Sequence, residues 1–126
     1  MSNNVVYSGE YVENKLPKTV VVHTLQAGDY TSYPINGDTV HVLYEAKIRS
    51  TNYKFEVVKS IPFKFTVGSN EVIEGLSLGI VKMCVGETAI IDIPSNYAYG
   101  EYGNTEKKVP PNEDVLYKLS LVKIDN

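Results

Sequence analysis

The chain has 126 residues, 43% of them hydrophobic and 21% charged, which predicts one domain large enough to bury its own core. Its net charge is −3, with 15 acidic against 12 basic residues, so we expect no nucleic acid partner, because no basic stripe is left to cover phosphates. No apolar run approaches the ~20 residues of a membrane-spanning helix, and we expect no membrane association.

The N-terminal sequence MSNNVVYSGE has neither the basic start nor the apolar stretch of a secretory signal. Cys84 is the single cysteine, so no internal disulfide can form. Both observations favour a reducing compartment, and we expect a cytoplasmic protein.

The first part of the chain divides into an extension and the start of a sheet. Residues 1–18 mix polar and apolar types without a clear period, so we expect an N-terminal extension ahead of a domain over residues 19–126. The run TVVVHTL (19–25) is rich in β-branched residues and predicts a strand.

Two further segments alternate in polarity. In TVHVLYEAKIR (39–49) every second side chain is apolar, which predicts a strand with one face in the core. His41 falls on the polar face of this strand and is expected to be solvated. The segment PFKFTVG (62–68) alternates again, with Phe65 and Val67 expected in the core.

The period becomes helical in NEVIEGLSLGIVKM (70–83), where the apolar residues fall close to one stripe: Val72, Ile73, Leu76, Ile80 and Met83. Asn70 is the predicted N-cap, and the helix is expected to end near Val81. Gly75 and Gly79 each cost about 1 kcal/mol relative to alanine, so we expect this bare face to pack closely against a neighbour.

The last part of the chain predicts more sheet. ETAIIDI (87–93) and DVLYKLSLVKI (114–124) indicate strands, and VPPN (109–112) indicates a rigid bend before the second of them. Many strands with one helix predict an α+β fold, a twisted and mostly antiparallel sheet with the helix against one face.

The residues offer little conventional catalytic chemistry. His23, His41 and Cys84 have neither metal-ligand spacing nor the pattern of a catalytic set, and no glycine-rich phosphate loop is present, so we expect no metal and no cofactor. Glu71 and Glu74 are three apart on the predicted helix, a spacing common on solvated faces. Three tyrosines in PSNYAYGEYG (94–103) instead suggest a surface with one apolar and one wet side.

In combination, PFKFTVGSNEVIEGLSLGIVKM, VGETAIIDIPSNYAYGEYG and VPPNEDVLYKLSLVKI resemble the FKBP-type peptidyl-prolyl cis-trans isomerases, over roughly residues 20–124. The resemblance implies a sheet wrapped across one short helix, and an enzyme that isomerises Xaa-Pro bonds and assists protein folding. Its partners would be proline-containing peptides and proteins, and macrolide immunosuppressants of the tacrolimus or rapamycin type. We expect a monomer.

The resemblance also implies an apolar pocket for the substrate proline. The residues expected to act on the substrate are Tyr44, Phe55, Glu56 and Tyr99, and those expected to bind substrate or inhibitor are Phe63, Val72, Ile73, Leu76, Val109 and Tyr117. The Ile73 backbone N–H and the Tyr99 hydroxyl would each donate a hydrogen bond to the bound substrate.

This sequence departs from the family pattern at the pocket. Leu76 stands where tryptophan is usual, Glu56 stands where aspartate is usual, and the loop after YAYG is about one residue longer, bringing in Lys107 and Lys108. We therefore expect reduced isomerase activity and reduced macrolide affinity. The alternatives are a proline-recognising binding module with little or no turnover, and a structural domain with a filled pocket.

Overall fold

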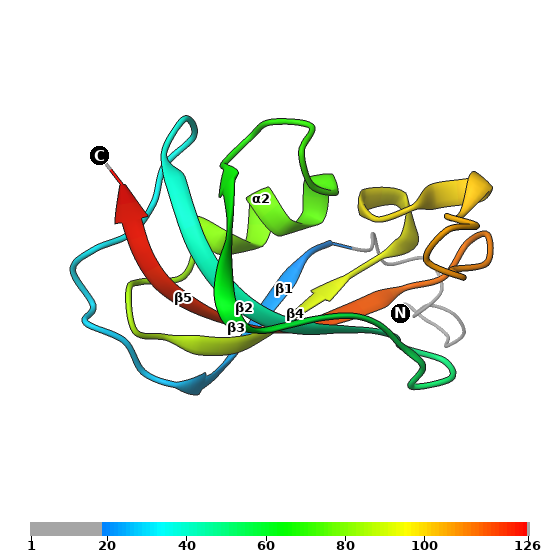
Figure 1. Ribbon diagram of the computed structural model, residues 1–126, viewed down its shortest axis with the longest axis horizontal. Helices are drawn as coiled ribbons and strands as arrows, with labels where there is room; N and C mark the ends of the chain where they lie inside the picture. The colour runs from blue at the N-terminus through cyan, green and yellow to red at the C-terminus, as the bar shows by residue number, and fades with distance from the viewer. Residues whose placement is uncertain (1–18, 126) are drawn as a thin grey trace, which may run out of the picture.

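The computed structural model describes residues 19–125, and within them a five-stranded sheet wraps one α-helix (Figure 1). The strands are β1 (Val21–Gln26), β2 (Thr39–Ile48), β3 (Lys54–Thr66), β4 (Thr88–Ile93) and β5 (Val115–Asp125), the α-helix is α2 (Glu74–Ile80), and two 3₁₀ helices, η1 (Ser95–Tyr97) and η2 (Gly100–Tyr102), follow β4. This confirms the predicted α+β class. The expected extension at 1–18 lies outside the described residues.

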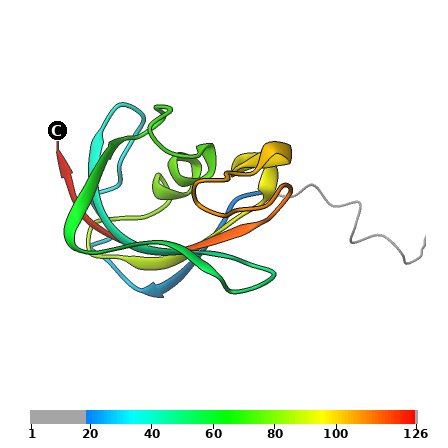
Figure 2. The same cartoon turned by 45° about the vertical axis from the view of Figure 1, so that its right-hand side comes forward.

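The sheet has the strand order β1-β4-β5-β2-β3, and each neighbouring pair is antiparallel. Its curvature cradles α2 on the concave side, which the turned view in Figure 2 shows most clearly. The long loop between β4 and β5 lies beside the start of α2, so helix, sheet and loop meet at one end of the molecule (Figures 1 and 2). None of the helices in residues 19–125 is long and apolar enough to cross a membrane.

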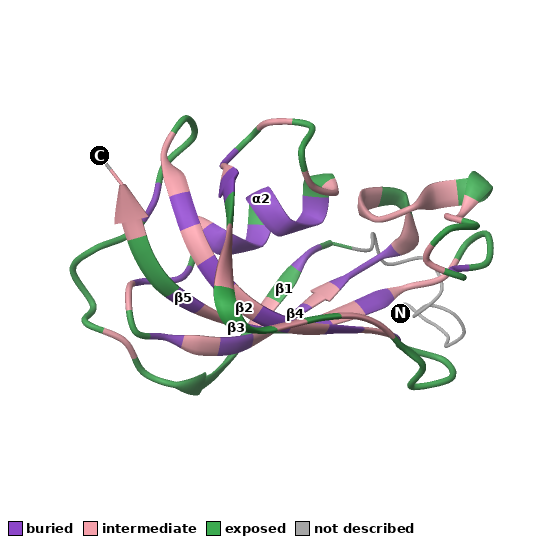
Figure 3. Cartoon of the chain, in the orientation of Figure 1, coloured by how far each residue is buried: buried purple, intermediate pink, exposed green. Residues whose placement is uncertain are grey.

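The core lies between the concave face of the sheet and α2. Along β2 every second side chain is buried, as the alternation predicts, and β4 repeats the pattern (Figure 3). Phe65 and Val67 are also buried, as expected. Burial of apolar area at about 25 cal/mol per Å² is the main force that holds helix and sheet together.

The two helix glycines permit a very close approach to β4. A Cβ at Gly75 would lie 2.3 Å from Ile93 Cγ2, and one at Gly79 would lie 2.7 Å from Ile91 Cγ2. Neither position has room for a side chain, which confirms the predicted close packing of this bare face and fixes the height of α2 above the sheet.

The predicted helix start at Asn70 is wrong. The α-helix begins at Glu74, and the N-cap residue is Ile73, whose backbone is extended (φ −61°, ψ 148°). Upstream, the Ser69 hydroxyl donates to the Thr66 carbonyl (2.7 Å) and the Glu71 carboxylate accepts the Thr66 N–H (2.7 Å). These hydrogen bonds between side chains and backbone stabilise the segment as a turn. They therefore compete with the backbone hydrogen bonds of a helix.

The predicted strand at 62–68 is only the second half of β3, which begins at Lys54. The first half was missed because β3 is an edge strand whose exposure follows no regular alternation. Because this half of the strand has no continuous buried face, apolar and polar residues do not alternate along it, and the sequence does not predict a strand there.

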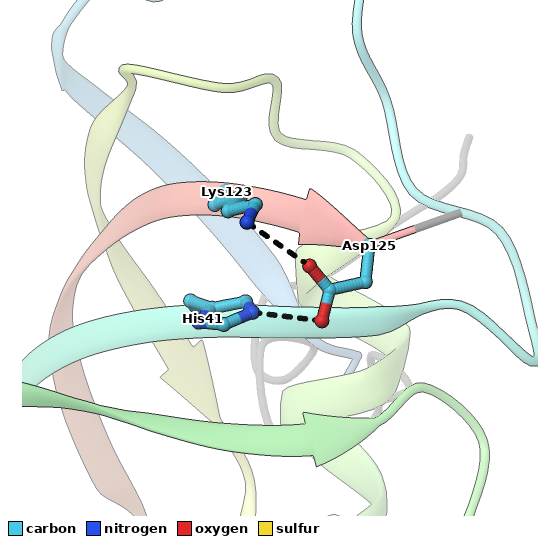
Figure 4. Close-up of polar contacts among 3 residues, drawn as sticks. All are labelled: His41, Lys123 and Asp125. Atoms are coloured by element: carbon cyan, nitrogen blue, oxygen red, sulfur yellow. Dashed lines mark hydrogen bonds and ion pairs between the residues drawn. The ribbon is translucent and has the colours of Figure 1, made fainter.

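On the outer face of the sheet, His41 is paired rather than simply solvated (Figure 4). Its Nε2 lies 2.9 Å from Asp125 Oδ2, its side chain is 19% exposed, and Lys123 Nζ lies 3.5 Å from the other Asp125 oxygen. The hydrogen bond with His41 is the main cause that lowers the pKa of Asp125. The cluster ties the end of β5 to β2, on the sheet face opposite α2.

A buried carboxylate anchors the edge strand β1. Glu87 accepts hydrogen bonds from the Thr24 hydroxyl (2.6 Å) and from the Cys84 N–H (3.1 Å). Cys84 itself is buried. This cysteine and this acid therefore have a structural explanation at the turn before β4.

Candidate active site

A cavity of about 320 Å³ opens between the concave face of the sheet, the start of α2 and the loop after β4. Its apolar and aromatic lining is Tyr44, Phe63, Val72, Ile73, Leu76, Tyr99 and Tyr117, and its polar lining is Glu56, Asn70, Glu71, Asn104 and Lys107. The size suits part of a peptide or a small ligand, and the mixed lining is typical of binding pockets.

All but two of the ten residues expected at the pocket line this cavity. The exceptions are Phe55 and Val109, which are not part of the lining. The Phe55 ring meets the rings of Tyr99 and Tyr117 edge-on, with centroids 5.9 and 6.2 Å apart. Val109 is buried, and its backbone pairs with that of Asn104.

The side wall of the cavity is an aromatic cluster from three strands. Tyr44 on β2 packs against Tyr117 on β5 with ring centroids 5.2 Å apart, and against Phe63 on β3 at 6.4 Å, edge to face. Tyr44 and Tyr117 come together because Ala46, two residues from Tyr44, pairs with Tyr117 across the sheet. Such offset and T-shaped packing fixes each ring against its neighbours.

Leu76, the residue expected at the floor, lines the cavity from the first turn of α2, with 2% of its surface exposed. One residue before α2, Ile73 lines the cavity, and its backbone N–H forms no hydrogen bond with any residue between 19 and 125. An N–H at a helix N-terminus has no intrahelical partner, so it is available to a ligand carbonyl.

The tyrosine hydroxyls of the cavity keep their protons at neutral pH. Burial, and next the negative charge of Glu56, raise the pKa of Tyr44. Burial also raises the pKa of Tyr117, with the neighbouring Tyr99 as the second cause. The pKa of Tyr99 is raised by burial as well, an effect that its interaction with Tyr117 partly offsets. These groups can therefore act as hydrogen-bond donors but not as bases.

An ion pair crosses the rim of the cavity. Lys107 Nζ, from the loop after β4, lies 3.2 Å from Glu56 Oε2 on β3, and each side chain is about one-third exposed (32% and 31%). The loop holds Lys107 in place, because Asn104 Oδ1 accepts the Lys107 N–H (2.9 Å) and Asn104 also pairs with Val109. The pair links the loop to the sheet beside the Tyr44 hydroxyl.

The three tyrosines of the stretch 94–103 lie in three different environments. Tyr97 packs against the core, Tyr99 lines the cavity, and Tyr102 is 86% exposed. The turn that follows Tyr102 depends on Gly103, which has φ +63° and where a Cβ would lie 2.4 Å from the Val109 carbonyl oxygen. A side chain at this position would push the loop away from its own stem.

Sequence reasoning named Lys107 as part of the longer loop at the pocket but not as a binding residue, and it missed three other polar residues of the lining, namely Asn70, Glu71 and Asn104. The first two immediately precede Val72 and Ile73, so their position next to the expected wall was a usable signal. Asn104 and Lys107 lie in a loop without periodicity, and nothing local predicts which way their side chains turn.

The cavity combines an apolar wall with hydrogen-bond donors and has no histidine or cysteine in its lining. Among residues 19–125 no group of three or more His, Cys, Asp or Glu side chains is placed to hold a metal ion. Such a site suits a reaction that depends on desolvation and on placed hydrogen bonds, without a nucleophile.

Comparison with known proteins gives consistent matches. The sequence pattern of the family described as FKBP-type peptidyl-prolyl cis-trans isomerase matches residues 31–122. The peptidyl-prolyl cis-trans isomerase Fkbp12 of Drosophila melanogaster is 34% identical over 107 residues, which cover 84% of this chain and 98% of the fly protein. FK506-binding protein 1 of Saccharomyces cerevisiae is 33% identical over 108 residues, covering 84% of this chain and 93% of the yeast protein.

A solved structure supports the same grouping. The N-terminal domain of FKBP42 from Arabidopsis thaliana superposes with a TM-score of 0.80 at 27% sequence identity, covering 87% of this chain and 89% of the other. The agreement in fold therefore extends over nearly all of the described residues.

Proposed function

This chain belongs to the FKBP-type peptidyl-prolyl cis-trans isomerases, and we propose that the cavity over Leu76 is where it binds and twists an Xaa-Pro bond. The observation that carries the proposal is an aromatic cavity lined by protonated tyrosines and by Ile73, whose backbone N–H has no hydrogen-bond partner among residues 19–125. The substrates are proline-containing peptides and proteins, and the biological role is assistance to protein folding.

The reaction needs no bond cleavage. Amide resonance holds the planar peptide bond behind a barrier of about 18–20 kcal/mol, and the planar form is more charge-separated than the twisted transition state. Transfer from water into an apolar cavity therefore costs the planar ground state more than the twisted state, which is differential binding in favour of the transition state.

Individual residues add to this effect. The Ile73 N–H binds a substrate carbonyl, and the Tyr99 hydroxyl donates a second hydrogen bond. The Leu76 side chain receives the proline ring from below. Glu56 orients the Tyr44 hydroxyl, Phe55 supports the ring of Tyr99, and Val109 holds Asn104 of the lining through their backbone pairing. Uncatalysed isomerisation takes tens to hundreds of seconds, which is slow enough for such assistance to matter in folding.

We further infer that macrolides of the FK506 type compete for this cavity, with reduced affinity. Relatives from Saccharomyces cerevisiae and Yarrowia lipolytica carry the name FK506-binding protein. In this chain Leu76 offers a macrolide ring no flat aromatic floor, and the Glu56–Lys107 pair makes the rim polar. The expected monomeric state and cytoplasmic location remain predictions from the sequence.

The same floor residue favours the second candidate, a module that binds proline segments but turns over little. Leu76 contacts a proline with less surface than an aromatic ring does, so both binding and catalysis would be weakened. Turnover distinguishes the two candidates.

The test is exchange NMR on a Leu-Pro peptide with catalytic amounts of protein. We compare the wild type with Tyr99→Phe, which removes the proposed donor, and with the matched control Tyr102→Phe, whose ring is exposed on the same loop. The wild type and the control should speed cis/trans exchange equally, and Tyr99→Phe should be about 2- to 10-fold slower, the range for one hydrogen bond. Shifted peptide signals without faster exchange would establish the binding module. No effect of any kind would refute both.

A further inference from the structure

We propose that Glu71 makes this cavity select substrates that carry lysine or arginine within a residue or two of the proline. The inference rests on the proposed function, since it concerns what binds in the same cavity. Two carboxylates, Glu56 and Glu71, are among the lining residues. They differ in whether a cationic side chain of the described residues pairs with them.

Glu71 is a fixed and ionised carboxylate. Its Oε1 accepts the Thr66 N–H at 2.7 Å and the Ser69 hydroxyl at 3.0 Å. The backbone hydrogen bond from Thr66 is the largest cause that lowers the pKa of Glu71. The side chain therefore does not swing freely into solvent, and one oxygen is held by the turn while the carboxylate stays at the edge of the cavity.

Glu71 also has no cation of its own. No ion pair joins it to any lysine, arginine or histidine of residues 19–125, whereas Glu56 is neutralised by Lys107 at 3.2 Å. The charged residues of the lining are these three, so the lining carries one uncompensated negative charge at Glu71.

The position of this charge relates it to the bound peptide. Glu71 stands two residues before Ile73, which lines the same cavity and whose N–H has no hydrogen-bond partner among residues 19–125. A peptide whose carbonyl binds the Ile73 N–H therefore passes the Glu71 carboxylate within a residue or two. The long stem of a lysine or arginine can cover that distance along the apolar surface of Val72.

The opposite preference, for acidic substrates through Lys107, is weaker on the same observations. A substrate carboxylate would have to separate Lys107 from Glu56 and would leave Glu56 unpaired beside it. A cation at Glu71 displaces no existing ion pair.

The test uses two peptide series with a Leu-Pro-Phe core. In one series Lys, Gln or Glu directly precedes the leucine, and in the other it directly follows the phenylalanine. Both the dissociation constant from NMR titration and kcat/KM from exchange NMR are measured, at low and at high salt. Glu71→Gln keeps an oxygen that can accept from Thr66 and Ser69 but removes the charge. Glu45→Gln removes an equal charge outside the cavity, from an exposed pair with Lys54.

In the wild type, at least one series should bind in the order Lys, Gln, Glu, with about two- to fivefold between Lys and Gln at low salt, the range for an exposed ion pair. High salt should reduce the difference, which checks the charge effect without any substitution. Glu71→Gln should abolish the preference for the Lys peptide over the Gln peptide, whereas Glu45→Gln should retain it.

Equal affinities for the Lys and Gln peptides in both series would overturn the inference while leaving the isomerase proposal intact. A lysine preference that persists in Glu71→Gln would assign the selection to another residue and would likewise overturn it. If even the Gln peptides neither bind nor isomerise, the proposed function itself fails, and the inference fails with it.

Discussion

Replacing Leu76 by tryptophan tests whether the floor of the cavity limits the kcat/KM of this enzyme. Leu76 is almost completely buried on the first turn of α2, and the cavity of about 320 Å³ lies above it. Because Leu76 lines this open cavity, an indole ring at this position can extend into it, whereas Gly75 and Gly79 on the same helix pack against β4. The substitution would give a bound proline a flat aromatic surface.

The size of the effect follows from the added contact. A well-placed aromatic contact contributes about 0.5–1.5 kcal/mol beyond simple area burial. At about 1.4 kcal/mol per factor of ten, Leu76→Trp should raise peptide affinity and kcat/KM about two- to twelvefold. Overpacking a filled core costs about 1–3 kcal/mol, and the open cavity should keep the loss of stability here below that range.

The assay is kcat/KM for a Leu-Pro peptide by exchange NMR, with the free energy of unfolding measured in parallel. Leu78→Trp is the matched control, since Leu78 lies on the same helix but is 40% exposed and outside the cavity lining. The control should leave activity unchanged. A folded Leu76→Trp protein with wild-type kcat/KM would refute the idea that the floor limits turnover.

Three further substitutions have defined outcomes in unfolding experiments. Gly75→Ala places a Cβ 2.3 Å from Ile93, so the free energy of unfolding should fall by about 1–3 kcal/mol despite the better helix propensity of alanine; a gain would contradict the close packing of α2. Tyr117 keeps its proton more firmly when folded than when unfolded, so its contribution is complete below pH 10.0, the ordinary pKa of tyrosine, and is lost as the pH rises further. Tyr117→Phe should make the alkaline loss of stability shallower by up to about 1.4 kcal/mol per pH unit, and an unchanged slope would contradict the raised pKa. Lys107→Met breaks the partly exposed pair with Glu56 and should cost less than about 1 kcal/mol in urea unfolding, whereas a much larger loss would mean that the pair holds the loop itself.

The elements that the sequence predicted well are those whose burial repeats along the chain. β2 alternates without a break because one face lies on the core, so its bounds could be placed to within a residue. The edge strand β3 has no such pattern in its first half. The start of α2 depends on side-chain contacts of Ser69 and Glu71 with Thr66, which a search for helical periodicity does not register.

The candidate site divides in the same way. The wall and floor could be expected from apolar positions matched to a family pattern, since burial constrains those side chains strongly. The ion pair of Lys107 with Glu56 at the rim could not, because it depends on the course of a loop in which even Lys108 adopts a positive φ of 61°. The direction of an exposed charged side chain on such a loop is set by tertiary contacts that local sequence does not reveal.

The pH dependence of kcat/KM tests most directly whether catalysis here depends on desolvation and hydrogen bonds without proton transfer. Measured by exchange NMR on an uncharged Leu-Pro peptide from pH about 5 to about 8, the range in which histidines titrate, the profile should be flat. No histidine lines the cavity, and its tyrosines keep their protons throughout this range. A bell-shaped or sigmoidal profile, with folding intact across the range, would show that a titrating group takes part and would contradict the mechanism.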